Sequence, residues 1–263
     1  MKVYQGEYVP GLSQLLGEDA CTFSMLYRIL GGKCAKIVTD HARVIMCLSA
    51  LPFPVWVWVA PDADAAELSR ACDALLAEFP PEAHSYNVGL PLARVLLERE
   101  PSLRKTVHLL GYHCRKAIAP GKRVSGLCSP VREDEIDLAA QWYRAMHMEC
   151  ALHEDVPMDA AREEIARYVQ AKGMFFWRDE RGVPKAMCGV GTDAQAGYIS
   201  HVYTDPAARR QGYAGNLVHA VAASLLELGK TPMLYTDADY AASNACYTQI
   251  GFELQGELCT ISR

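Results

Sequence analysis

Residues 198–214 read YISHVYTDPAARRQGYA, and this stretch decides the fold of the C-terminal half. A β-rich run ends at Asp205-Pro206, and a small basic loop follows it. The chain then opens into a helix whose apolar residues recur on one face: Leu217, Val218, Val221, Ala222, Leu225 and Leu226. Backbone N–H groups at such a helix start attract anions, and Gly212 lets a phosphate approach closely. The stretch predicts a phosphate-binding loop, and it is not a Walker loop, because no GxxxxGK[ST] occurs in the chain.

The loop fits R-x-x-G-x-A through Arg209, Gly212 and Ala214. This resembles the acyl-CoA pyrophosphate signature of the GNAT N-acetyltransferase superfamily, [QR]-x-x-G-x-[GA]. Downstream, a short strand is expected at 233–236, and residues 243–252 read SNACYTQIGF. That segment is similar to the closing motif of the family, a helix bearing Asn and Tyr followed by Gly-Phe at the next strand. The resemblance covers roughly residues 125–263.

The resemblance implies an α/β (α+β) fold over residues 122–263, with a mixed central sheet and flanking helices. The residue pattern agrees with strands at 125–131 and 198–204 and helices near 133–148 and 159–171. A hairpin is expected from 174–178 into 184–190, turning at 179–182, and a strand pair is expected over 252–262.

Residues 1–120 form a separate predicted α/β domain with a similar order of elements. Strands are expected at 44–49, 55–59 and 86–90, and helices at 65–78 and 92–98. The corresponding loop at 60–66 lacks glycine and basic residues, and Asp62 and Asp64 would repel a pyrophosphate. This domain is therefore either a degenerate GNAT-like repeat without cofactor or an unrelated α/β cap. In both cases we expect the cofactor in the second half.

Composition limits the classes of function. The net charge of −5 argues against a protein that coats nucleic acid and favours a cationic or neutral partner. The ten cysteines form no CxxC pair and no secretion signal precedes them, which predicts the cytoplasm. The apolar stretch 44–60 is interrupted by Pro52 and Pro54, so it predicts strands and no membrane span.

The resemblance also assigns the residues that would bind acetyl-CoA. Main-chain groups of the splayed strand before the loop would hold the thioester carbonyl, here those of Val202, Tyr203 and Thr204. The pyrophosphate would contact the loop backbone and at least one of the guanidinium groups of Arg209 and Arg210. The predicted loop residues are Arg209, Arg210, Gln211, Gly212, Tyr213, Ala214 and Gly215. Asn244 would bind the pantetheine arm.

Tyr247 is the predicted catalytic residue. In many members of the family a tyrosine at this place donates its proton to the departing CoA sulfur. Tyr247 lies three residues after Asn244, so both lie on one helix face. Cys246 is its neighbour, but its position about 100° around the helix makes it a poor nucleophile.

The sequence does not decide the general base. The family often has a glutamate on the strand that reads Tyr198-Ile-Ser-His-Val here, and this chain has none. Strand alternation would place His201 on the face opposite Ser200. Both His201 and an ordered water held by backbone groups are candidates for the general base.

Acidic and histidine residues gather between the first two predicted helices of the second half. The resemblance places this segment, 147–155, beside the acceptor cleft, where these side chains would bind a cationic amine: Glu149, His153, Glu154 and Asp155. A solvated acidic turn is the alternative. The segment lacks HExxH spacing and no PCxxC follows it, so we expect no metal site.

The sequence thus predicts an acetyl-CoA-dependent N-acetyltransferase that transfers directly to a primary amine of a small molecule or an amino terminus. One alternative is a non-catalytic acyl-CoA-binding or sensing module. Another is a tandem-GNAT acyltransferase that uses aminoacyl-tRNA, which the negative charge disfavours.

Overall fold

The computed structural model describes residues 1–149 and 155–263 and divides them into two compact units. The first unit contains residues 1–111, 237–239 and 255–263, and the second contains residues 112–236 and 240–254. Within the described ranges, every helix is too short or too polar to cross a lipid bilayer.

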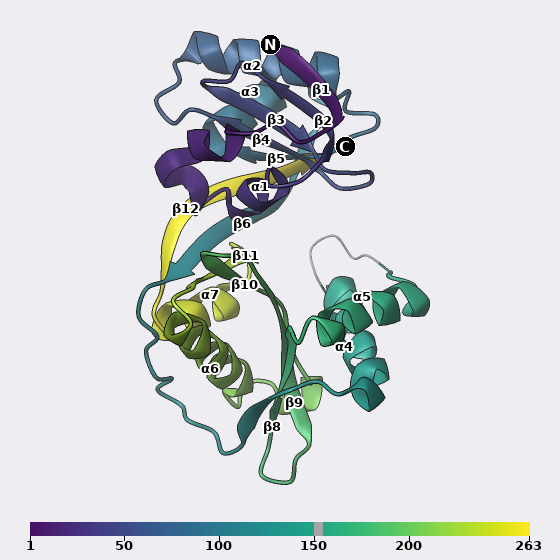
Figure 1. The fold of residues 1–263 in the computed structure, drawn as a ribbon, viewed down its shortest axis with the longest axis vertical. Coiled ribbons are helices and arrows are strands. Elements are labelled where there is room, and N and C mark those ends of the chain that lie inside the picture. Colours follow the sequence, from purple (N-terminus) through teal and green to yellow (C-terminus); the bar gives the residue numbers. More distant parts are fainter. Residues whose placement is uncertain (150–154) are drawn as a thin grey trace. The chain divides into compact units, whose positions relative to one another are not determined.

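The first unit is a mixed sheet with helices on both faces (Figure 1). Its strand order is β1-β2-β3-β4-β5-β12-β6, and β4 and β5 are parallel while β1 to β4 are antiparallel neighbours. The strands are β1 (Lys2–Glu7), β2 (Cys34–Thr39), β3 (Val44–Leu48), β4 (Val55–Val59), β5 (Tyr86–Gly89) and β6 (Arg104–Cys114). The helices are η1 (Leu12–Ala20), α1 (Ser24–Ile29), α2 (Ala65–Glu78) and α3 (Leu90–Arg99).

Apolar strands place the core of this unit between the sheet and helices α2 and α3. β4 reads VWVWV, and its alternating side chains are buried on both faces. Val55 and Val57 pack in one cluster with Leu75 of α2 and Leu96 of α3. On the other face, the indole N–H of Trp58 donates a hydrogen bond to Asp19 of η1 at 2.8 Å.

The second unit is also a mixed sheet, ordered β11-β10-β9-β8-β7. Its strands are β7 (Leu127–Pro130), β8 (Met174–Arg178), β9 (Pro184–Thr192), β10 (Ala196–Thr204) and β11 (Thr231–Asp237). Its helices are η2 (Glu133–Glu135), α4 (Ile136–Glu149), α5 (Met158–Gln170), η3 (Pro206–Ala208), α6 (Tyr213–Glu227) and α7 (Ala241–Gln249). Figure 1 shows α4 and α5 on one face of this sheet and α6 on the other.

Helix α6 lies on the sheet through the apolar face that its sequence predicts. That face is buried except at Leu226, which is partly exposed. Leu225 packs so closely on β10 that a Cβ atom at Gly197 would come within 2.4 Å of it. On the opposite face, Trp142 and Ile165 pack with Phe176 and Tyr203 in a second core.

The two units repeat one order of elements. In the first, β2, β3 and β4 are antiparallel neighbours, and α2 connects β4 to its parallel neighbour β5. In the second, β8, β9 and β10 are antiparallel neighbours, and α6 connects β10 to its parallel neighbour β11. Helices α3 and α7 follow at the same place in each repeat, as do β6 and β12. The chain therefore contains an internal structural repeat.

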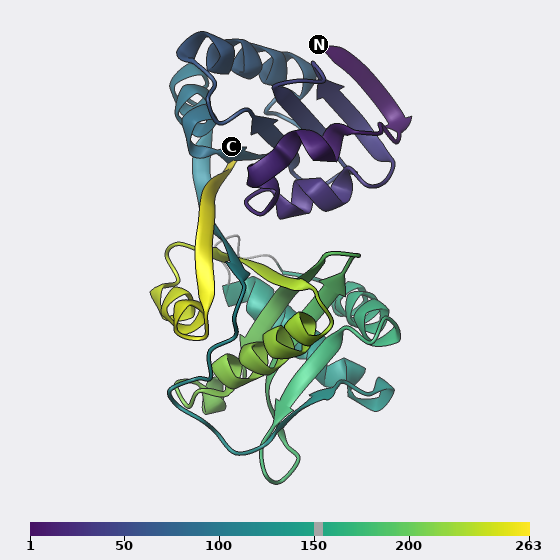
Figure 2. The same ribbon diagram turned by 60° about the vertical axis from the view of Figure 1, so that its left-hand side comes forward.

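The C-terminal segment differs from the sequence expectation. The expected strand pair over 252–262 is wrong, because this segment is one continuous strand, β12 (Phe252–Ser262). Leu258 to Ile261 pair antiparallel with β5, and residues 255–263 belong to the first unit (Figure 2). The compact units consequently do not coincide with the predicted division at residues 120–122.

Candidate functional site

The loop before α6 has the geometry of an anion cradle. After β10, the Asp205 carboxylate accepts a hydrogen bond at 2.9 Å from the backbone N–H two residues on, which begins η3. Arg210 (φ 61°) and Gly212 (φ 99°) both have left-handed backbone conformations, and α6 begins at Tyr213. Turns of this kind direct backbone N–H groups outward into a concavity that suits an anion.

The N-terminus of α6 leaves its first backbone N–H groups available. The residue at its N-cap is Gly212, and no side chain caps the helix. The N–H groups of Tyr213, Ala214 and Gly215 have no acceptor within an α-helix, and the helix dipole adds partial positive charge there. A Cβ atom at residue 212 would lie 3.3 Å from the Lys122 carbonyl oxygen, and the φ disfavours any L side chain. The predicted need for glycine at this position is therefore explained by the backbone.

The corresponding helix of the first repeat, α2, has a side-chain cap at its N-terminus. The Asp64 carboxylate accepts a hydrogen bond from the Glu67 N–H at 2.8 Å, and the Glu67 carboxylate accepts one from the Asp64 N–H at 3.0 Å. Arg43 forms ion pairs with Glu67 and Asp62. This helix is capped by its own carboxylates, which would repel a phosphate.

Asn216 and Lys122 hold the α6 loop in place. The buried Asn216 amide donates hydrogen bonds to the Lys122 carbonyl oxygen at 2.8 Å and to the Gly212 carbonyl oxygen at 2.9 Å. The Lys122 ammonium donates one to the Arg210 carbonyl oxygen at 3.2 Å. The connector at 118–124 therefore supports the loop, which the sequence did not indicate. An asparagine at a buried position of an otherwise apolar helix is the one signal that could have revealed it.

The side chain of Arg209 folds away from the helix start and toward α4. Its Nη2 lies 2.9 and 2.8 Å from the two carboxylate oxygens of Glu149, and its Nε donates to the Thr204 carbonyl oxygen at 3.2 Å. The guanidinium carbon lies 5.3 Å from the centroid of the Tyr203 ring. The Tyr203 hydroxyl also donates to Glu149, at 3.1 Å. One of the two guanidinium groups predicted to contact the phosphate, that of Arg209, is therefore paired with a carboxylate.

Strand β10 carries an irregularity where the sequence analysis places the thioester. Its register against β9 shifts between Ser200 and Tyr203, and His201 has a φ of 53°. β10 pairs with the parallel β11 from Ala196 to Ile199. The main-chain groups of Val202 to Thr204 thus lie beyond the parallel pairing, which suits the splayed strand that the family resemblance requires.

The irregularity changes the environment of His201. The expected alternation is wrong here, because Ser200 and His201 lie on one side: their Oγ and Nδ1 atoms are 2.9 Å apart. The imidazole stacks on Tyr143, with ring centroids 5.0 Å apart, and lies 5.1 Å from the Tyr168 ring. Burial, with a smaller contribution from His147, lowers the pKa of His201 to about 4. The side chain is therefore neutral at neutral pH.

Helix α7 brings Tyr247 and Asn244 near the start of α6. A Cβ atom at Gly215 would lie 3.2 Å from the Cys246 sulfur, so the two helices touch there. Tyr247 is buried, its ring centroid lies 6.1 Å from that of Phe252, and burial raises its pKa far above the ordinary value. Burial also raises the pKa of Cys246. Both groups therefore keep their protons at neutral pH.

The predicted acceptor segment is described only at its ends. Glu149 is paired with Arg209, and Asp155 is paired with Arg144 at 2.9 Å. His153 and Glu154 lie outside the described residues. Over residues 1–149 and 155–263, no group of three or more His, Cys, Asp or Glu side chains is arranged to hold a metal ion.

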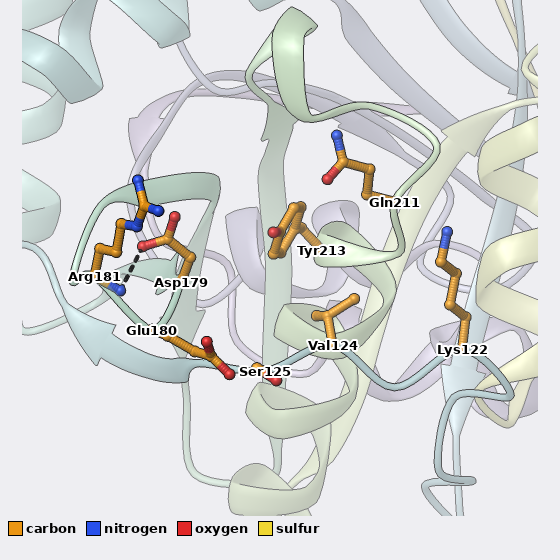
Figure 3. Close-up of a pocket in the computed structure, with 8 residues that line it drawn as sticks. All are labelled: Lys122, Val124, Ser125, Asp179, Glu180, Arg181, Gln211 and Tyr213. Atoms are coloured by element: carbon orange, nitrogen blue, oxygen red, sulfur yellow. Dashed lines mark hydrogen bonds between the residues drawn. The ribbon is translucent and has the colours of Figure 1, made fainter.

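An open groove of about 410 Å³ adjoins the loop. Figure 3 shows the residues that line it: Lys122, Val124, Ser125, Asp179, Glu180, Arg181, Gln211 and Tyr213. They come from the connector, from the turn between β8 and β9, and from the start of α6. Gln211 and Tyr213 were predicted from the sequence as binding residues, whereas residues 179–182 were predicted only as a hairpin turn.

Comparison with known proteins supports the fold and the family of the C-terminal part. Residues 180–261 match the family model described as FR47-like protein. No curated protein matches the chain. A GCN5-related N-acetyltransferase from Sphaerobacter thermophilus is similar in structure, with a TM-score of 0.70 and 13% identity over 99% of this chain and 94% of that one.

Two further solved structures cover nearly the whole chain. A GNAT-family acetyltransferase from Colwellia psychrerythraea has a TM-score of 0.64 and 12% identity over 99% of both chains. A GCN5-related N-acetyltransferase from Kribbella flavida has a TM-score of 0.61 and 16% identity over 95% of both chains. At these identities the structures establish the fold, and that fold extends over both units. Residues 180–261 thus match the FR47-like family model, and the fold of the chain is GNAT-like throughout.

Proposed function

We propose that the chain is an acetyl-CoA-dependent N-acetyltransferase acting on the primary amine of a small molecule or an amino terminus. The observation that carries this proposal is the contrast between the two repeats. Helix α6 has Gly212 as its N-cap residue and no side-chain cap, whereas α2 is capped by Asp64 and Glu67. The backbone from Arg210 to Gly215 fits a pyrophosphate, so the second unit is the proposed place of acetyl-CoA.

Bound acetyl-CoA would supply the acetyl thioester, and residues of the chain would orient it. The backbone of Val202, Tyr203 and Thr204 would bind the carbonyl oxygen, and Asn244 would bind the pantetheine arm. Oriented dipoles of this kind stabilise the charge that develops on an oxygen during acyl transfer.

Tyr247 would protonate the departing thiolate. Its raised pKa keeps the hydroxyl protonated at neutral pH, as a general acid requires. No hydrogen bond of this hydroxyl occurs among residues 1–149 and 155–263, so the described residues leave its proton unengaged.

The amine must lose a proton before or during its attack. A partly buried imidazole with a pKa of about 4 is a weak base for an ammonium group. We therefore infer that water held near the irregularity in β10 takes this proton rather than His201.

The amine would enter beside Glu149 and Asp155. Both carboxylates are exposed ion-pair partners of arginines, and exposed pairs contribute at most about 1 kcal/mol, so a cationic substrate can exchange with them. Asp155→Asn tests this role without disturbing Arg209. We expect a raised amine KM and an unchanged acetyl-CoA KM, with a weaker dependence of kcat/KM on ionic strength. If Asp155→Asn and the wild type have the same amine KM and the same dependence on ionic strength, Asp155 does not belong to the acceptor site.

A non-catalytic acyl-CoA-binding module is the second candidate. It is favoured by the lack of a carboxylate on β10 and by the weak basicity of His201. A thiol-release assay with acetyl-CoA against a panel of amines, amino acids and peptides separates the two. Turnover with any acceptor above the rate without enzyme supports the transferase. Tight CoA binding without turnover on the whole panel supports the module.

A further inference from the structure

The carboxylate of Glu149, at the C-terminal end of α4, closes a ring of contacts with the end of β10. It accepts hydrogen bonds from Nη2 of Arg209 at 2.9 and 2.8 Å and from the Tyr203 hydroxyl at 3.1 Å. Nε of Arg209 donates to the Thr204 carbonyl oxygen at 3.2 Å. Tyr203 and Thr204 are neighbours in β10, so the strand itself completes the ring. One side chain of α4 is thereby connected to two successive residues of the strand.

This ring contacts β10 where the strand has left one of its neighbours. The parallel pairing with β11 ends at Ile199, whereas the antiparallel pairing with β9 continues at Tyr203 and Thr204, after the register shift. A strand segment paired on one side only is held less firmly than one inside a sheet. The contacts of Glu149 therefore support the segment of β10 that the sheet supports least.

The contacts form a network rather than an isolated surface ion pair. Tyr203 is buried, and its ring packs on Trp142 with centroids 6.1 Å apart. The guanidinium carbon of Arg209 lies 5.3 Å from the centroid of the Tyr203 ring. The Tyr240 hydroxyl donates to the main-chain carbonyl oxygen of Glu149 at 2.7 Å, which fixes the end of α4. Isolated exposed pairs contribute little, whereas a network of several contacts holds each member in one position.

Acyl transfer depends on how well the groups around the thioester are oriented. In the proposed reaction, main-chain groups from Val202 to Thr204 bind the carbonyl oxygen. Such dipoles stabilise the developing charge because their orientation is fixed before the reaction begins. A side chain that fixes this main chain therefore raises the rate without touching either substrate.

We propose that Glu149 is a positioning residue of the acyl site, acting through Arg209 and Tyr203 on the main chain of Tyr203 and Thr204. This rests on the proposed function, because it takes the end of β10 as the place of the thioester carbonyl. Arg209 then serves β10, and the pyrophosphate is held by the backbone of the α6 loop. The Glu149 side chain is 50% exposed, and a carboxylate has about four lone-pair positions, so an amine can contact it while Arg209 stays in place.

The experiment measures polarisation of the thioester directly and requires no acceptor amine. Acetyl-CoA labelled with ¹³C at the acetyl carbonyl is bound to the full chain, and its carbonyl resonance is recorded by NMR. The wild type should move this resonance downfield, because hydrogen-bond donors draw electron density from the carbonyl carbon. Glu149→Ala and Arg209→Ala should each lose most of this shift. The double variant should lose no more than either single variant, since both residues act through one ring.

Affinity separates positioning from binding. By calorimetry, the dissociation constant for acetyl-CoA should change by less than about twofold in both variants, because neither side chain touches this ligand. Glu149→Gln keeps an acceptor for the Tyr203 hydroxyl but loses the charge that holds Arg209, so its carbonyl shift should be intermediate. Asp137→Ala is the matched control and should keep both the shift and the affinity. Asp137 also lies on α4, and it forms an exposed pair with Arg162 at 2.7 Å.

Two results would overturn the positioning role and leave the proposed function standing. One is a full carbonyl shift in both alanine variants. The other is a retained shift with much weaker acetyl-CoA binding in Arg209→Ala, which would assign Arg209 to the pyrophosphate. Failure of the wild type to bind acetyl-CoA, or binding without any carbonyl shift, would instead contradict the proposed function itself.

Discussion

At the scale of single residues, Tyr247 is the side chain on which the proposed chemistry depends most. Tyr247→Phe keeps the ring that packs near Phe252 but removes the proton. We expect kcat to fall by about 10²- to 10⁴-fold, the usual contribution of a general acid, while CoA affinity changes little. Steady-state kinetics and calorimetric titration with CoA measure the two effects. A kcat within threefold of the wild type would mean that the thiolate leaves without this residue.

His201 makes stability depend on pH. Its pKa is about 4 in the folded protein against an ordinary 6.5, so the unfolded chain takes up the proton first as pH falls below 6.5. The stability contributed by neutral His201 is complete above that pH and is lost progressively toward pH 4. By linkage, the loss amounts to about 2 kcal/mol at pH 5.

Between pH 7 and pH 5, the free energy of unfolding of His201→Asn should fall by about 2 kcal/mol less than that of the wild type, as measured by urea denaturation. Asparagine tolerates the left-handed backbone at this position. His41→Asn is the matched control, since His41 is exposed and has a φ of 61°. Parallel pH dependences of wild type and His201→Asn would show that the imidazole titrates normally.

Residue patterns predicted the loop and its glycine but did not predict the partners of the charged residues. Gly212 was identified because it belongs to the R-x-x-G-x-A pattern, and its φ of 99° gives a second reason for glycine at this position. The pairing of Arg209 with Glu149 has no local signature, because the two residues come from different elements. His201 was misplaced because the register shift beside it depends on how β10 pairs with β9.

At the scale of elements, the difference between α2 and α6 lies in how each helix begins. Removing the cap of α2 should therefore affect stability and leave the cofactor site intact. Asp64→Ala should lower the free energy of unfolding by about 1 kcal/mol, as loss of an N-cap does. Asp62→Ala is the control, because its exposed pair with Arg43 should contribute less.

The CoA affinity of Asp64→Ala should equal that of the wild type. Denaturation and CoA titration of the same preparations measure both quantities. A weaker CoA complex in Asp64→Ala would mean that the first repeat takes part in cofactor binding.

Elements whose apolar residues recur with a clear helical or strand period were predicted well, and elements in which charged residues interrupt the apolar pattern were missed. The strands at β8 and β9 and the helices at α2 and α6 lie where their patterns place them. β2 was missed because Lys36 interrupts its apolar run, and that side chain is held by the Glu78 carbonyl oxygen at 2.7 Å. β6 was missed because it carries charged and partly exposed residues over much of its length.

At the scale of the whole molecule, the repeat explains why one chain has two units with the same order of elements and one proposed cofactor loop. The order of elements is shared, and the loops that follow β4 and β10 differ in charge and in glycine. The final strand of the second repeat, β12, pairs with β5 of the first. A fragment of residues 122–263 would therefore expose Leu258 and Ile261, which are buried in the full chain, so the full chain is the right material for binding experiments.

Calorimetric titration of the full chain with CoA tests the central claim most directly. We expect one CoA per chain, because the N-terminus of α6 has no side-chain cap and that of α2 is capped. Gly212→Asp should abolish binding, since it places a carboxylate where the pyrophosphate would lie and demands a φ of 99° from an L residue. Two equivalents of CoA per chain, or full affinity in Gly212→Asp, would contradict the assignment of the cofactor to the loop before α6.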